Sequence, residues 1–231
     1  MHLKWEGGLS VKQLQYQTVI WDFDGTLVDT SPGIFRSLRV AFQRLGYPDP
    51  SPELLSRFVG PPLFQAFQEH VGMSPQQAEQ ALLAFRADYE ARGVYQSQLY
   101  SGLEEILRQL HAAGAKLGVA TLKPERMARL LLRQFGLLDL MDACVGSDDQ
   151  DRGTRTKAQM IQIVLDQVGC KNPQQAVLIG DTRFDLEGAK QAGVPFLAAG
   201  YGFGELESLL GPDAPLARTP GELENYLFVN A

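Results

Sequence analysis

The sequence predicts an α/β fold, in which a parallel sheet is covered by helices on both faces and an all-helical segment is inserted near the start. Two observations support this prediction. From residue 102 onward, helical patterns alternate with short apolar strands, which is typical of a parallel sheet. Before that point one buried strand is followed only by helical patterns, and these are more numerous than a single crossover between strands requires. We therefore expect the early helices to form a cap.

The composition is that of an ordinary globular protein. The chain has 231 residues, of which 45% are hydrophobic and 21% are charged, enough for one domain or for a core with a smaller insertion. Its formal net charge of −6 gives no electrostatic reason to expect nucleic acid or an anionic membrane as a partner. We expect neither partner, and an anionic substrate would need a local cationic site.

The sequence also bears on location. Cys144 and Cys170 lie in separate segments, so neither a disulfide framework nor a cysteine-rich zinc site is expected. Residues 1–17 have no apolar run long enough for a signal peptide, and no later segment is suited to span a bilayer. We expect residues 1–17 to be a loose N-terminal extension and the protein to be cytoplasmic.

The first predicted strand ends in two acids. Residues 19–23 are mostly β-branched or aromatic, as expected for a strand that is buried on both faces. Asp22 and Asp24 are two apart and start toward the same face, and Gly25 then permits a sharp turn. Such a pair of carboxylates indicates a divalent metal, a nucleophile and acid pair, or both. Taken alone, the tetrapeptide is explained more simply as a strand ending in a turn.

The cap is predicted to span residues 32–98. Its first helix begins at Ser31 and Pro32, which are typical of a helix cap and of the first helical position, and ends at Gly46. Further helices are expected over residues 52–58, 62–71 and 75–92. The core domain then comprises residues 18–31 and 99–231, with linkers to the cap at residues 29–32 and 98–102.

The core domain is predicted to alternate helices and strands along the rest of the chain. The predicted strands after the first cover residues 116–121, 143–146, 176–180 and 194–198. The predicted helices cover residues 103–113, a segment from residue 123, a segment from residue 157, a segment ending near residue 193, and residues 223–228.

Polar residues follow several of these strands. Because the strands of a parallel sheet share one direction, their carboxyl ends and the groups beyond them gather at one edge. A hard cation bound by carboxylates and bridged to phosphate is a usual magnesium arrangement, and a hydroxyl, an ammonium and backbone N–H groups could hold the other phosphate oxygens. The sequence therefore predicts a phosphoryl-transfer site. Its members are Asp22, Asp24, the backbone around Gly25, Thr121, Lys157 and Asp181.

These residues resemble the four motifs of the haloacid dehalogenase superfamily. The matching segments are residues 22–30, the strand-ending Thr121, the helix-starting Lys157 and residues 180–185, in the same order and on the same elements. The chain is most similar to the phosphoglycolate phosphatase-like members, which carry a helical cap of the C1 type between the first two motifs. The resemblance implies a Rossmann-like core.

The resemblance also implies a role for each residue. Asp22 is expected to attack phosphorus and form an aspartyl-phosphate, and Asp24 to protonate the leaving oxygen and then activate water. Mg²⁺ would be held by the carboxylates of Asp22 and Asp181 and by the backbone carbonyl of Asp24. Thr121 and Lys157 would bind and neutralise the transferring group. Asp185 would orient Lys157 or a metal-bound water, although it could also be a plain first-turn residue of its helix.

Substrate selection is expected to involve the cap. Arg57 and Gly60 lie in the cap segment that would face the site, although simple cap packing would also explain this segment. Lys123 is a weaker rival to Lys157 for the phosphate-binding role, and the role of Arg155 stays open.

The sequence predicts a Mg²⁺-dependent phosphatase of small phosphorylated metabolites, with 2-phosphoglycolate as the leading substrate. The alternatives are a nucleotide or sugar monophosphate phosphatase, or a sugar phosphate mutase, since mutases share the motifs. A more distant alternative is a non-catalytic binding protein that uses the same fold.

Overall fold

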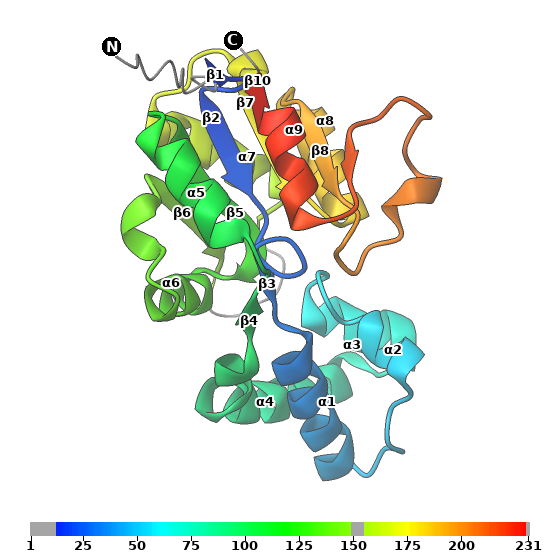
Figure 1. The fold of residues 1–231 in the computed structure, drawn as a ribbon. Coiled ribbons are helices and arrows are strands. Elements are labelled where there is room, and N and C mark those ends of the chain that lie inside the picture. Colours follow the sequence, from blue (N-terminus) through cyan, green and yellow to red (C-terminus); the bar gives the residue numbers. More distant parts are fainter. Residues whose placement is uncertain (1–12, 149–154, 230–231) are drawn as a thin grey trace, which may run out of the picture.

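The computed structural model describes residues 13–148 and 155–229. It has two parts, a sheet domain and a helical cap (Figure 1). The first and last described strands, β1 (Gln13–Leu14) and β10 (Phe228–Val229), pair antiparallel at the end of the sheet domain that is remote from the cap (Figure 1). Residues 1–12 of the predicted N-terminal extension lie outside the described residues, while its last part contributes β1.

Within the described residues, six parallel strands form the central sheet in the order β6-β5-β2-β7-β8-β9. The strand β2, which precedes the two acids, lies between β5 and β7. The predicted α/β fold with a parallel sheet is confirmed. The strands are β2 (Thr18–Trp21), β5 (Lys116–Pro124), β6 (Ala143–Ser147), β7 (Ala176–Gly180), β8 (Phe196–Ala199) and β9 (Leu216–Ala217).

Helices bury both faces of this sheet. On one face, side chains of α5 (Leu103–Ala112) and α6 (Glu125–Gln134) join a core cluster with Val19 and Trp21 of β2. On the other face, Ile20 joins side chains of the remaining two large core helices. Successive residues of a strand point to opposite faces, which explains why β2 is apolar throughout. The helices of the second face are α7 (Lys157–Val168) and α8 (Arg183–Ala192), and the short α9 (Glu224–Leu227) lies near the C-terminus.

The cap consists of helices that follow β2 in the chain. Phe42, Phe58 and Phe67 pack together between the first three of these helices, with ring centroids 5.0 to 6.3 Å apart. The cap helices are α1 (Ser31–Arg44), α2 (Pro52–Ser56), α3 (Leu63–Val71) and α4 (Pro75–Ala91), followed by the 3₁₀ helix η1 (Gly93–Gln96).

The connection between the two parts is more regular than the sequence predicts. Segments expected as linkers contain β3 (Val28–Asp29) and β4 (Gln98–Leu99), which pair antiparallel between the sheet domain and the cap (Figure 1). Each strand has only two residues, so no periodic pattern marks them in the sequence. The pairing brings the entry to the cap and the exit from it side by side.

Element boundaries differ from the predictions at a few places. The N-cap position of helix α1 is Thr30 rather than Ser31, and the Thr30 side chain makes no capping hydrogen bond. The Ser31 hydroxyl donates to Asp29 at 2.7 Å. Strand β5 continues past Thr121 to Pro124, since Pro124 still pairs with β6. The last large strand begins at residue 196 rather than 194, and β9, β1 and β10 were not predicted. In the part of the chain that the structure describes, no helix has the length and apolar character needed to cross a membrane.

The cap helix α1 approaches η1 so closely that Gly33 is required between them. A Cβ at Gly33 would lie 2.0 Å from the carbonyl oxygen of Gly93. Replacing glycine by alanine inside a helix normally stabilises the helix by up to about 1 kcal/mol. At position 33 we expect the replacement to destabilise the protein instead, because the added Cβ would clash with Gly93. We expect Gly33→Ala to lower the free energy of unfolding by about 1–3 kcal/mol in urea titrations.

The control for this change is Gly221→Ala. A Cβ at Gly221 meets no heavy atom within 4 Å, so this variant should unfold close to the wild type. A Gly33→Ala variant as stable as the wild type would contradict the close approach of α1 and η1.

Candidate active site

The residues predicted for the site follow neighbouring strands of the sheet. Asp22 follows β2, Thr121 lies near the end of β5, and Asp181 follows β7. Lys157 is the first residue of α7, which packs over β5 and β6. Its N-cap residue Thr156 shares a capping box with the third residue of the helix, which fixes where α7 begins. Parallel strands and this helix start therefore direct the four side chains to one edge of the sheet.

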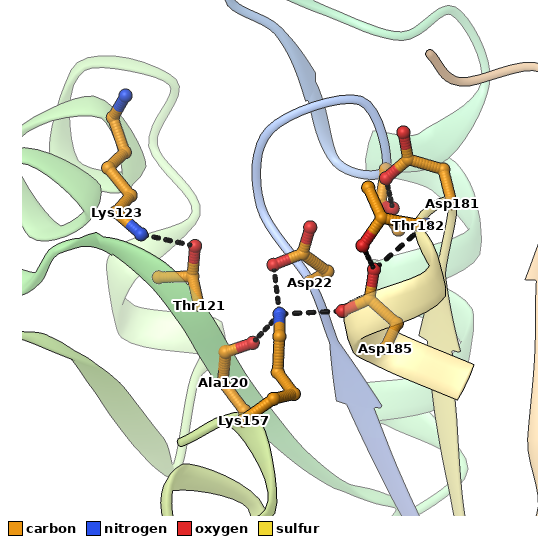
Figure 2. A network of polar contacts seen from close by, with 9 residues as sticks. Asp22, Ala120, Thr121, Lys123, Lys157, Asp181, Thr182 and Asp185 are labelled. Carbon is orange, nitrogen blue, oxygen red and sulfur yellow. Dashed lines mark hydrogen bonds and ion pairs between the residues drawn. The ribbon is translucent and has the colours of Figure 1, made fainter. Parts of the chain in front are cut away.

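A buried lysine joins two of the acids (Figure 2). The Lys157 Nζ atom donates to Asp22 Oδ1 at 2.6 Å and to the carbonyl oxygen of Ala120 at 2.9 Å. It also lies 2.6 Å from Asp185 Oδ1 as an ion pair, without the alignment of a hydrogen bond. Burial alone would lower the pKa of Lys157, but Asp185 and Asp22 outweigh it and raise this pKa. Lys157 is therefore a buried cation held by two carboxylates.

Burial acts in the opposite direction on the acids. It raises the pKa of Asp22 well above its ordinary value, Asp185 adds to the rise, and Lys157 opposes it. Burial also raises the pKa of Asp181 to about 7, again with a contribution from Asp185. The ionised carboxylates of Asp22 and Asp181 are thus destabilised by burial and by the negative charge of their neighbours, unless a further cation is present.

Asp181 is held in place by its neighbours in the turn after β2 and in the loop after β8. Its Oδ1 accepts a hydrogen bond from the Thr26 hydroxyl at 3.0 Å, and its Oδ2 accepts one from the Phe203 N–H at 2.8 Å. A Cβ at Gly25 would lie 2.3 Å from Asp181 Oδ2. Glycine at position 25 therefore lets the Asp181 carboxylate approach the end of β2, in addition to adopting its φ of 85°.

Three buried acids could hold a metal ion together. Asp22, Asp181 and Asp185 each offer a carboxylate oxygen, and these oxygens lie within 4.8 Å of one another. Lys157 alone does not balance three carboxylates, and carboxylate oxygens are preferred ligands of hard divalent cations. The donor set therefore fits a divalent cation. Of the three acids, Asp185 has the most contacts with other protein groups. Its Oδ1 lies beside Lys157, and its Oδ2 accepts hydrogen bonds from the backbone N–H and the hydroxyl of Thr182, at 3.0 and 2.6 Å.

Asp24 belongs to a different set of contacts. Its Oδ1 accepts from the Thr30 hydroxyl at 2.6 Å and from Lys123 Nζ at 3.1 Å. Lys123 Nζ also donates to the hydroxyl of Tyr89, on cap helix α4, at 2.7 Å. In Figure 2 the Lys123 side chain extends away from Lys157 and its acids. The two lysines therefore have different partners, since Lys157 contacts Asp22 and Lys123 contacts Asp24. That Lys157 rather than Lys123 binds phosphate stays a prediction.

Two predicted phosphate contacts have partners within the protein. The buried Thr121 Oγ1 accepts from the backbone N–H of Lys123 at 3.1 Å, which leaves its hydroxyl proton available to a phosphate oxygen. The Gly25 N–H instead donates to the carbonyl oxygen of Val28 at 2.9 Å. This one donor is therefore used within the turn after β2, and the prediction that backbone N–H groups around Gly25 bind phosphate stays a prediction.

The two predicted cap residues line different cavities. Gly60 lines a cavity between cap and core that also contains Asp24 and Lys123. A Cβ at Gly60 would lie 3.0 Å from the Thr182 side chain, so this part of the cap lies against the core. Arg57 is exposed and lines a separate, more open groove with Thr182.

Sequence reasoning assigned no site role to Tyr89, Thr30 or Thr26. Thr26 and Thr30 stand within the acid-rich segment after β2, so their position alone could have drawn attention to their hydroxyls. Tyr89 gives no such signal, because it lies on an amphipathic helix where an aromatic residue is normally core. Arg155, whose role stayed open, donates to the carbonyl oxygen of Gly146 at 3.4 Å.

Comparison with known proteins agrees with this geometry. A model of the haloacid dehalogenase-like hydrolase family matches residues 19–199. The chain belongs to this family. Its fold is similar to that of a predicted phosphatase from Clostridium acetobutylicum, with a TM-score of 0.84 and 32% identity over 91% of this chain and 97% of the other.

Three curated relatives carry different names. A protein named 5'-nucleotidase from Pseudomonas aeruginosa is 37% identical over 85% of this chain and 88% of its own length. A phosphoglycolate phosphatase from Yersinia pseudotuberculosis is 30% identical over 90% of this chain and 91% of its own length. A protein named Tyrosine-protein kinase PtkA from Mycobacterium tuberculosis is 37% identical over 83% of this chain, which spans 64% of that relative.

Family membership and the phosphatase likenesses together show that this haloacid dehalogenase-like protein is an enzyme of the phosphoric monoester hydrolase class. The buried acidic cluster is consistent with a metal site in such an enzyme.

The raised pKa values predict how metal binding depends on pH. Protons and a divalent cation compete for the same carboxylates, and the pKa of Asp181 is about 7 before metal binds. We therefore expect Mg²⁺ to raise the melting temperature more at about pH 8 than at about pH 6, measured by thermal unfolding with and without excess Mg²⁺.

The matched variants are Asp181→Asn and Asp139→Asn. Asp181→Asn removes a ligand of the candidate metal site and should abolish most of the Mg²⁺-dependent shift, whereas exposed Asp139→Asn should keep it. An equal or larger Mg²⁺ effect at the lower pH would show that these carboxylates do not bind the ion.

Proposed function

We propose that this haloacid dehalogenase-like protein is a Mg²⁺-dependent phosphatase of small phosphorylated metabolites, with 2-phosphoglycolate as the leading substrate. The reaction would pass through an aspartyl-phosphate on Asp22. The observation that carries the proposal is the placement of Asp22, which lies 2.6 Å from Lys157 and within the same acidic cluster as Asp181. The name of the Yersinia relative supports the substrate.

In the first step, an Asp22 oxygen attacks phosphorus, and the bond between phosphorus and the leaving oxygen breaks. The contact of Asp22 with Lys157 falls on Oδ1, so Oδ2 is the oxygen available for attack. Asp24 gives its proton to the leaving oxygen. Both described contacts of the Asp24 side chain fall on its Oδ1, which leaves Oδ2 to face the leaving group.

In the second step, water attacks the phosphorus of the aspartyl-phosphate and the bond to Asp22 breaks, releasing inorganic phosphate. Asp24 takes the proton from this water and returns to its starting state. Lys157 and the Thr121 hydroxyl hold oxygens of the transferring group, and the Lys157 charge opposes the negative charge that accumulates there. Burial strengthens this electrostatic effect.

Mg²⁺ would be held by Asp22, Asp181 and the backbone carbonyl of Asp24, and would supply charge neutralisation to the phosphoryl group. Asp185 would act as a positioning residue, because both of its oxygens are engaged by Lys157 and Thr182. Asp185 thereby fixes the ammonium beside the nucleophile. We further propose a cytoplasmic location, consistent with two cysteines outside any disulfide.

A nucleotide monophosphate phosphatase is the second candidate, and the name of the Pseudomonas relative favours it. It would use the same two steps with a larger leaving group. A sugar phosphate mutase would return the phosphoryl group to a sugar instead of to water, so its product is an isomer rather than inorganic phosphate. A non-catalytic protein would release no phosphate from any substrate.

The proposal predicts that Asp22→Asn loses activity while remaining folded. The amide cannot form an acyl phosphate as the carboxylate does, so the release of inorganic phosphate should fall by about a thousandfold or more. The measurement is a panel of 2-phosphoglycolate, nucleoside monophosphates and sugar phosphates with Mg²⁺, with circular dichroism to check the fold.

Exposed Asp139→Asn is the control and should keep wild-type rates. An Asp22→Asn variant that turns over at a comparable rate would rule out Asp22 as the nucleophile. Isomerised sugar phosphate without inorganic phosphate would replace the phosphatase proposal with a mutase.

A further inference from the structure

The cavity that contains Asp24 extends between the cap and the core. Its apolar walls come from both parts, and its volume is about 60 Å³, which is room for a few water-sized molecules. If Asp24 gives its proton to the leaving oxygen, this cavity is where the rest of the leaving group must lie. The apolar and aromatic lining residues are Ile34, Phe58, Leu63, Phe85, Leu122 and Met127.

Most charged side chains that face this cavity are paired. Lys123 lies 3.1 Å from Asp24, and both side chains are almost fully buried. Arg126 of α6 pairs with Glu90 of α4 across the boundary between core and cap. Lys123 and Arg126 thus each have a carboxylate partner within the protein. The remaining charged residue of the lining is Arg86.

Arg86 has a buried nitrogen without a partner. Its Nη2 atom is screened from solvent and makes no hydrogen bond within the described residues. A guanidinium stays charged in proteins, and a buried donor that is left unpaired is costly. Arg86 belongs to α4, one turn before Tyr89, which contacts Lys123 beside Asp24. A ligand in the cavity with an oxyanion at its far end would satisfy this nitrogen.

We propose that Arg86 is a specificity-determining residue that binds an oxyanion on the leaving group of the substrate. The cavity then selects short phosphomonoesters whose alcohol carries a carboxylate or a second phosphate, rather than neutral alcohols or nucleosides. The inference rests on the proposed phosphatase function, because it places the leaving oxygen at Asp24. Tyr89 and the apolar walls line the same cavity as Arg86.

The test compares substrates that differ only in the distal charge. One pair is 2-phosphoglycolate and its neutral amide, and the other is ethylene glycol bisphosphate and the monophosphate. We expect wild-type kcat/KM to favour the charged member of at least one pair by about tenfold or more, as a hydrogen bond to a charged group provides. Arg86→Gln should remove this preference mainly by lowering kcat/KM for the charged member, and Arg86→Lys should restore part of it.

Arg39→Gln is the control, because Arg39 is exposed on cap helix α1 and does not line the cavity. It should keep the wild-type preference. The substrate pair whose charge preference is lost in Arg86→Gln identifies the bound oxyanion as a carboxylate or a phosphate. An equal loss for both members of each pair would assign Arg86 a structural role, and a wild type without preference for either charged member would overturn the inference.

A binding measurement separates this inference from the proposed function. Calorimetry with Asp22→Asn reports the affinity for 2-phosphoglycolate and ethylene glycol bisphosphate without turnover. Addition of Arg86→Gln to that variant should weaken at least one of them by about tenfold and leave the neutral partners unchanged. If the wild type releases no phosphate but Arg86→Gln weakens binding, the proposed phosphatase function is wrong and the Arg86 subsite is supported. If the wild type is active but Arg86→Gln does not weaken binding, only the Arg86 subsite is wrong.

Discussion

The site depends on one buried ammonium. Lys157 Nζ lies between the carboxylates of Asp22 and Asp185, and none of the three side chains is more than 6% exposed. Such an arrangement is stable only when charge and hydrogen bonds are both satisfied, since removal of one partner leaves an uncompensated buried charge. Glycine makes room for the lysine stem, because a Cβ at Gly188 would lie 2.5 Å from Lys157 Cγ. The close packing of α8 on α7 therefore helps to position the Lys157 side chain in the site.

The two acids after β2 are separated by their partners. Asp22 contacts Lys157 and points into the acidic cluster, whereas Asp24 contacts Lys123 and borders the cavity beneath the cap. Each carboxylate thus has its own ammonium. A phosphoryl group near Asp22 and a leaving group near Asp24 would occupy these two environments, which is the division of labour that an acid and a nucleophile require.

The cap contacts the candidate site through α4. Tyr89 accepts a hydrogen bond from Lys123, so the cap holds the cation that in turn contacts Asp24. The β3–β4 ribbon fixes the two crossings between core and cap next to each other. Relatives with different names, a 5'-nucleotidase and a phosphoglycolate phosphatase, match this chain over most of its length. The fold alone therefore does not specify the substrate.

The sequence by itself determined the succession of the main strands along the chain, the parallel sheet, the helical segment after β2 and the acids that follow β2 and β7, because local apolar patterns and strand ends carry this information. The order of the strands within the sheet came only from the structure. The sequence favoured Lys157 over Lys123 as the phosphate-binding residue but did not reveal their separate partners, which depend on β5 continuing past Thr121 and on α7 lying over the same edge. The unpaired nitrogen of Arg86 is likewise a property of the packed structure. Partners distant in the chain become neighbours only when cap and core pack together, and no local pattern records that contact.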